Sequence, residues 1–194
     1  MTTTRLEAFS DAVIAIVITI MVLEFQVPEG ADWHALGEVA PAFLMYTLSF
    51  VFLAIYWNNH HHLLHATARV SGGILWANMH LLFWLSLVPF TTAWTGESRL
   101  APLPTAAYGA VLLLASLAYW ILVNAIIARE GPESRLRAAI GSDLKGKISI
   151  LIYAAAIPLA FVNPVIAGAL YIAVAGIWLF PDPRIERRLD AERG

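Results

Sequence analysis

The chain has 194 residues, of which 59% are hydrophobic and only 13% are charged, and its formal net charge is −2. Its mean hydropathy is +0.70, which is too apolar for a soluble domain of this size to cover its surface with polar side chains. The absence of cysteine excludes disulfides and thiolate-ligated metal or haem. We expect no nucleic-acid partner.

The apolar stretches are about as long as a bilayer requires, roughly 20 residues each, and lack the alternation of barrel strands. We therefore predict an all-α integral membrane protein, a single domain of six transmembrane helices. In chain order, the helices are expected at about residues 6–27, 38–64, 72–94, 104–128, 147–162 and 165–180, followed by a charged cytoplasmic tail at 181–194.

The first predicted helix opens on a charged and polar motif that contains Arg5, Phe9, Ser10 and Asp11. Charged groups at the mouth of a membrane helix are expensive to place near hydrocarbon. They usually pair with other protein groups, face water or mark an ion pathway. The motif therefore points to a functional or structural role for this helix.

Further along the same helix, Ile16, Thr19, Ile20 and Leu23 follow the i, i+3, i+4, i+7 spacing that places residues on one face. Asp11 points away from that face. Around a symmetric axis, Ile16 and Leu23 would form hydrophobic rings that gate ions by dewetting, and Thr19 would supply oxygen ligands between them. An apolar stripe of this kind is more often lipid-facing or packed, so both alternatives stay open at this point.

The second predicted helix ends in a histidine cluster, His60, His61 and His62, and the third contains Pro89, which implies a kink. Membrane di-iron oxidases use several separated histidine boxes, whereas this chain has one cluster at a helix end. We therefore predict no resident metal and no cofactor.

The sequence also shows no nucleophile and base arranged for catalysis. We therefore predict no catalytic residue and no enzyme activity.

The distribution of basic residues predicts the orientation in the membrane. Of the twelve Lys and Arg, only Arg99 falls in a predicted outer loop when six spans are assumed. Because short cytoplasmic loops carry most of the Lys and Arg, both termini are predicted to lie in the cytoplasm, in a multi-pass protein of the cell (plasma or inner) membrane. Six helices enclose no obvious path alone, so a channel would require a symmetric oligomer.

Three motifs resemble those of the transmembrane protein 175 family, the endolysosomal potassium channels and their prokaryotic homologues. The resemblance covers residues 5 to about 92. The motifs are Arg5-x-x-x-Phe9-Ser10-Asp11, Trp57-Asn-Asn-His60-His61, and Leu75-Trp76-Ala-Asn78 followed by Leu87-Val-Pro89-Phe90-Thr91.

The resemblance implies a homotetramer in which the first helix of each copy lines a central pore, without the re-entrant Thr-Val-Gly-Tyr-Gly filter of other potassium channels. The hydrophobic constriction of the family maps onto Ile16 and its pore threonine onto Thr19. A further apolar ring maps onto Leu23, with Ile20 beside it. The implied function is passive, potassium-selective conduction, with K⁺ passing transiently near Thr19 and with the bilayer, monovalent cations and other copies of the chain as partners.

The resemblance also implies that Arg5, Phe9, Ser10 and Asp11 hold the first helix in place. Their expected partners on the second and third helices are Trp57, His60, His61, Trp76 and Asn78. We expect Ser10 and Asp11 to contact some of the last four. The alternative, that each polar group is satisfied separately at the interface, stays open for any single pair.

A secondary transporter for a small cation or solute is the alternative function. It would predict inverted repeats and broken helices around a midplane site. The sequence shows no internal repeat, so we rank the channel first.

Overall fold

The computed structural model describes residues 2–131, 136–137 and 143–179. The predicted tail at 181–194 and residue 180 of the sixth predicted helix lie outside the described residues. Within the described part, all regular secondary structure is helical, as predicted. The helices are α1 (Thr3–Leu23), α2 (Trp33–Glu38), α3 (Ala40–His65), α4 (Gly72–Ser86), α5 (Val88–Glu97), α6 (Pro102–Glu130), α8 (Leu144–Val162) and α9 (Pro164–Leu179).

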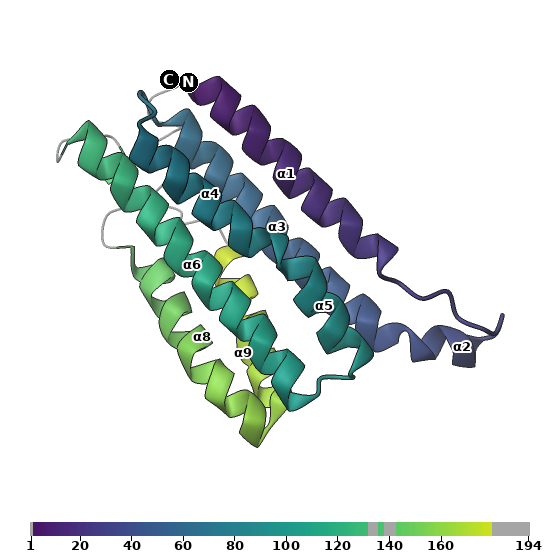
Figure 1. Cartoon of the computed structure of the whole chain (residues 1–194). Coiled ribbons are helices and arrows are strands. Elements are labelled where there is room, and N and C mark those ends of the chain that lie inside the picture. The colour runs from purple at the N-terminus through teal and green to yellow at the C-terminus, as the bar shows by residue number, and fades with distance from the viewer. Residues whose placement is uncertain (1, 132–135, 138–142, 180–194) are drawn as a thin grey trace, which may run out of the picture.

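The long helices run roughly alongside one another as a membrane-type bundle (Figure 1). Five stretches of the described chain are long and apolar enough to cross a bilayer: α1, α3, the combined stretch Gly72–Glu97, α6 and α8. The sixth, α9, is a shorter apolar helix of 16 residues. The fold is thus a helical membrane bundle, with five long spans and one shorter apolar helix.

The third predicted helix, 72–94, is two helices in the structure. Helix α4 ends at Ser86, and α5 begins at Val88 with Pro89 in its first turn. Proline has no amide hydrogen to donate to the preceding turn, so it suits the start of a helix better than its interior. The kink expected at Pro89 is therefore a helix boundary around Leu87.

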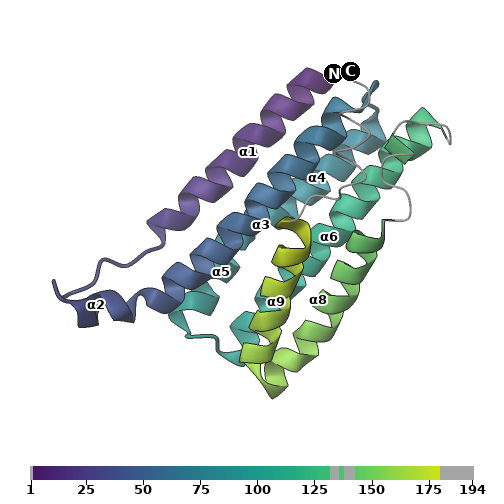
Figure 2. The same cartoon turned by 180° about the vertical axis from the view of Figure 1, so that it is seen from behind.

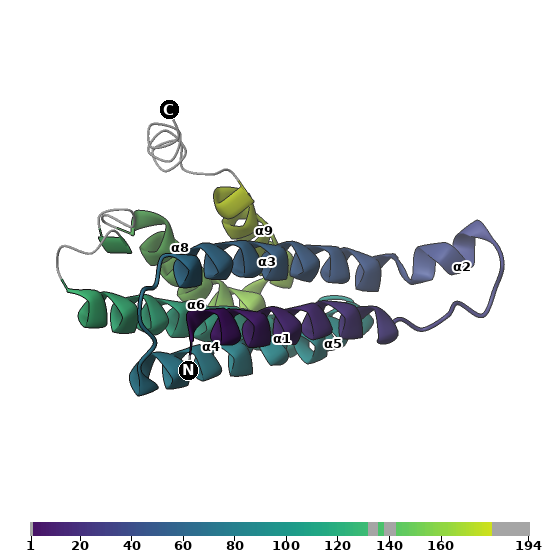
Figure 3. The same ribbon diagram turned by 90° about the horizontal axis from the view of Figure 1, so that it is seen from above.

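The region after the first helix also differs from the prediction. Helix α1 ends at Leu23, four residues before the expected end at 27. Val27 precedes Pro28 and is therefore biased away from the helical conformation, which disfavours the expected end. The short helix α2, which the sequence did not predict, then begins at Trp33. It is capped by Asp32, whose side chain accepts a hydrogen bond from Ala35 N at 2.8 Å. This segment projects beyond the bundle (Figure 1, Figure 3).

Two cores hold the bundle together, and α3 and α6 contribute to both. One lies between α1, α3, α4 and α6 and includes Ile14 and Leu81. The other lies between α3, α6, α8 and α9 and includes Phe52 and Tyr171. Figures 2 and 3 show α1 on the opposite side of the molecule from the α8–α9 hairpin.

Small residues allow close helix packing, which matters because lipid provides no hydrophobic driving force between helices. At Gly96 of α5, an added Cβ would lie 2.7 Å from the Cα of Ala42 in α3. Glycine at this position therefore lets the two backbones touch. Ser49 Oγ of α3 shares one hydrogen bond with Thr92 Oγ1 of α5 (2.7 Å) and another with the Tyr108 hydroxyl of α6 (2.9 Å), so the three helices are linked.

Candidate functional site

Helix α1 lies at the edge of the bundle and packs against α3, α4 and α5. On its packed face, Ile14 and Val17 are 0% and 5% exposed. On the opposite face, Ile16 and Leu23 are 56% and 78% exposed. Ile20 and Thr19 are also exposed. The face that the helical spacing selected is therefore the face that the subunit leaves uncovered.

The Thr19 hydroxyl has a geometry suited to a cation. Its Oγ1 lies 3.1 Å from the carbonyl oxygen of Ala15 and 3.0 Å from that of Ile16, so its hydrogen is donated to the backbone of the same helix. A hydroxyl has one hydrogen and two acceptor lone pairs. With the hydrogen used inside the helix, the exposed oxygen offers lone pairs to a group outside.

A buried chain of hydrogen bonds fixes α1 to α4 and α3. Ser10, fully buried, donates to the carbonyl of Leu6 at 2.8 Å and accepts from Asn78 Nδ2 at 2.9 Å. The Asn78 Oδ1 lies 2.6 Å from His60 Nε2. Because an amide oxygen only accepts, His60 Nε2 carries the hydrogen, and its Nδ1 carries a lone pair. That Nδ1 is buried without a hydrogen-bond partner among the described residues.

A second, more exposed row of contacts runs beside the first. Trp57 Nε1 donates to Asp11 Oδ1 at 3.0 Å, and the Trp57 ring stacks on His61 with centroids 6.1 Å apart. The Nδ1 atom of His61 lies 2.8 Å from Glu7 Oε1. Sequence reasoning missed Glu7, although it lies one helical turn before Asp11 and so on the same face.

The structure therefore shows which of the expected partners contact the motif and which do not. It brings Ser10 to Asn78 and Asp11 to Trp57, and it links His60 to Ser10 only through Asn78. Trp76, expected in this network, is 77% exposed and points away from it. Arg5 and Phe9 are exposed in the single subunit.

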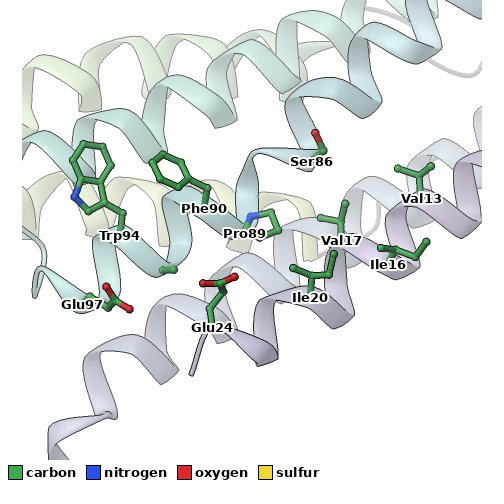
Figure 4. A pocket seen from close by; sticks show the side chains of 11 residues that line it. Val13, Ile16, Val17, Ile20, Glu24, Ser86, Pro89, Phe90, Trp94 and Glu97 are labelled. Carbon is green, nitrogen blue, oxygen red and sulfur yellow. The ribbon is translucent and has the colours of Figure 1, made fainter. Parts of the chain in front are cut away.

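A groove of about 820 Å³ lies between α1 and α5. Ile16 and Ile20 line it from α1, and Phe90 and Trp94 line it from α5 (Figure 4). Glu24 and Glu97 also line the groove, both toward the end where Trp94 lies. The sequence pattern gave no reason to pair these two residues, which come from different helices.

These features define a class of protein: a multi-pass helical membrane protein whose first helix lies at the edge of the bundle. Hydrogen bonds near the N-terminal end hold this helix in place, and the rest of the subunit does not cover one of its faces. The family described as "Endosomal/lysosomal potassium channel TMEM175" matches residues 5–89. A potassium channel from Chryseobacterium sp. is 54% identical over 97% of this chain and 98% of that relative. The chain belongs to the TMEM175 family.

Two further comparisons agree with this assignment. A potassium channel from Streptomyces collinus is 34% identical over 71% of this chain and 76% of its own length. The crystal structure of a lysosomal potassium-selective channel TMEM175 homolog from Chamaesiphon minutus superposes with a TM-score of 0.80 at 26% identity, covering 91% of this chain and 96% of that chain.

The family predicted from the motifs is thus confirmed. The named relatives are channels, so the secondary transporter is not favoured, and the family is one of channels rather than enzymes.

Proposed function

We propose that the chain is the subunit of a homotetrameric, potassium-selective cation channel in the cell (plasma or inner) membrane, with both termini in the cytoplasm. The helix α1 of each copy lines the central pore. K⁺ is the permeant ion, and no resident cofactor takes part. The names of the relatives support potassium as the ion.

The observation that carries the proposal is the uncovered face of α1. Its other face is packed on α3, α4 and α5, and the buried bond from Asn78 to Ser10 holds it there. A single bundle encloses no path along that face, so a path requires further copies around an axis. Four copies would bring the exposed Ile16 and Leu23 side chains together as rings.

In this arrangement the gate is hydrophobic. Rings of Ile16 and Leu23 exclude water when the constriction is narrow, and ions pass only when it is wetted. Thr19, between the two rings, supplies the oxygen atoms that replace part of the hydration shell of K⁺, because its hydrogen is directed into the helix.

Glu24 and Glu97 stand at one end of the groove beside α1. With both termini in the cytoplasm, that end faces the outside. Two carboxylates there raise the local concentration of cations and so the rate at which they enter.

Flux measurements on protein reconstituted in liposomes under opposed potassium and sodium gradients test the proposal. Ile16→Asn should raise conductance, because a polar ring is wetted more easily. Thr19→Ala should weaken the preference for potassium. The matched control is Thr47→Ala, since Thr47 also donates to its own helix, at 2.8 Å from the Phe43 carbonyl, but belongs to α3 instead of α1.

The outcomes separate a pore-lining face from a lipid-facing one. If α1 faced lipid, Ile16→Asn would hinder membrane insertion and leave the flux per folded channel unchanged. Absence of cation flux from the wild type and both variants would overturn the channel. A strictly coupled, saturable flux would favour the transporter.

A further inference from the structure

A second cavity lies far from α1, between α3, α6, α8 and α9. It has a volume of about 50 Å³. Aromatic side chains from all four helices form its wall, and Asp143 is its one charged member among the described lining residues. The residues used below are Phe52, Tyr56, Tyr119, Tyr153, Trp178 and Asp143.

The polar hydrogens of this wall are largely committed to the protein itself. Trp178 Nε1 donates to Ser149 Oγ at 2.9 Å, and the Tyr119 hydroxyl donates to the Asn59 carbonyl at 3.3 Å. The hydroxyl of Tyr56 shares a hydrogen bond of 3.0 Å with Ser116. The wall therefore offers a guest mainly acceptor oxygens and aromatic side chains, which suit a hydrogen-bond donor or a cation.

Asp143 is fixed against this cavity by its role at the start of α8. Its Oδ1 accepts from Gly146 N at 3.2 Å. Both carboxylate oxygens lie 2.6 Å from where a Cβ on Gly146 would be, so only glycine leaves room for the carboxylate. The backbone φ of Asp143 is 44°, in the left-handed region, which Asp and Asn tolerate better than most residues.

Removal from water raises the pKa of Asp143, and the Gly146 amide and the charge of Lys147 only oppose that rise. The carboxylate is therefore less well stabilised than it would be in water. A positive charge in the cavity would supply the missing stabilisation.

We propose that this cavity binds the ammonium group of a small organic cation, with Asp143 as the counter-charge and the aromatic rings as walls. The volume corresponds to roughly three to five water-sized spheres, the size range from methylammonium to tetramethylammonium. Ring faces attract such cations through their quadrupoles. A bare K⁺ or Na⁺ instead needs a cage made of oxygen atoms alone, whereas aromatic rings from four helices make up much of this wall.

The same ammonium chemistry occurs in free amines and in the choline or ethanolamine headgroup of a lipid. Binding here is independent of the proposed conduction, because no residue of this cavity belongs to α1 or to the groove beside it. A failure of either proposal therefore leaves the other standing.

Thermal unfolding of the purified protein in detergent, followed by tryptophan fluorescence, tests the proposal. Tetramethylammonium chloride should raise the Tm of the wild type above its value in equimolar NaCl, since a ligand that binds only the folded state stabilises it. Asp143→Asn, which keeps a side-chain oxygen for the cap, should weaken binding by about tenfold or more. Glu38→Gln, which removes an exposed carboxylate of α2 that lines neither the groove nor this cavity, should bind as the wild type does.

Two further arms complete the experiment. If Asp143→Asn does not yield folded protein, Trp178→Phe, which keeps the carboxylate, should also weaken binding. Adding phosphatidylethanolamine or phosphatidylcholine, with phosphatidylglycerol as control, identifies the source: a shift that depends on Asp143 with these lipids alone assigns the cavity to a headgroup. An equal shift in wild type and Asp143→Asn, or none with any ammonium probe, would overturn the proposal.

Discussion

A threonine hydroxyl can coordinate a permeating cation through its oxygen only when its hydrogen is directed elsewhere. In α1, Thr19 directs its hydrogen toward the carbonyls of Ala15 and Ile16, and its oxygen is on the uncovered face. The neighbouring Ile16 supplies no polar atom. In the proposed channel, selectivity and gating therefore belong to different side chains, about one helical turn apart.

Substitutions at Thr19 separate the hydroxyl from the shape of the side chain. Thr19→Ser keeps the hydroxyl and should retain the preference for potassium, whereas Thr19→Val keeps the shape and should lose most of it. The measurement is the reversal potential under bi-ionic potassium and sodium conditions. Equal reversal potentials for Thr19→Val and the wild type would rule out the hydroxyl as the selectivity element.

The pKa of Asp143, raised by burial, predicts a pH-dependent stability. The unfolded chain ionises Asp143 at a lower pH than the folded protein does. The contribution of Asp143 is therefore fully present below the unfolded pKa of about 4 and falls as the pH rises through the folded pKa. Asp143→Asn removes this loss of stability, so the Tm of this variant should rise relative to the wild-type Tm as the pH increases above about 4. If the Tm of Asp143→Asn minus the wild-type Tm stayed constant or decreased with rising pH, the raised pKa of Asp143 would be contradicted.

At the scale of the helices, two rows of polar contacts hold α1 in position against α3 and α4. The inner row passes from Ser10 through Asn78 to His60, all fully buried, and so joins three helices. The outer row, from Asp11 to Trp57 and from His61 to Glu7, is partly solvated. Buried polar groups are costly to leave unpaired, so the inner row should dominate the stability of this arrangement.

Asn78→Leu tests the inner row. It leaves the Nε2 hydrogen of His60 without an acceptor and should cost about 1–3 kcal/mol in the free energy of unfolding. The control is Asn124→Leu, because Asn124 is exposed and donates to the Trp120 carbonyl of its own helix at 2.7 Å. Thermal unfolding in detergent compares the two, and equal Tm values would argue against a structural role for the row.

Across the whole molecule, much of the bundle could be predicted from hydropathy, because span length is set by the bilayer. Helical spacing grouped the residues of the face of α1 that the structure leaves uncovered, but it did not decide whether that face would be packed. The break around Leu87 was expected only as a kink, since a proline inside an apolar run is compatible with either. Residue spacing within one helix does not predict which residues of other helices it will contact.

That limit explains what the sequence missed at the sites. Trp76 belongs to a recognisable motif but faces outward, and Glu7 was overlooked beside the more prominent Asp11. The proposed ammonium cavity joins Tyr56 of α3 and Tyr119 of α6 to Asp143 at the start of α8, and only the packing of these helices brings the three residues together. Such groupings depend on tertiary structure, which no local pattern specifies.

The central claim is that the uncovered face of α1 faces water inside a pore. Because the sequence contains no cysteine, single cysteines can be introduced without background. A water-soluble, positively charged methanethiosulfonate reagent reacts with ionised thiols and so reports contact with water. In liposome flux assays, it should block Leu23→Cys and leave wild type and Met21→Cys, which lies on the packed face at 4% exposure, unaffected. Unaltered flux through fully active Leu23→Cys channels would contradict the account.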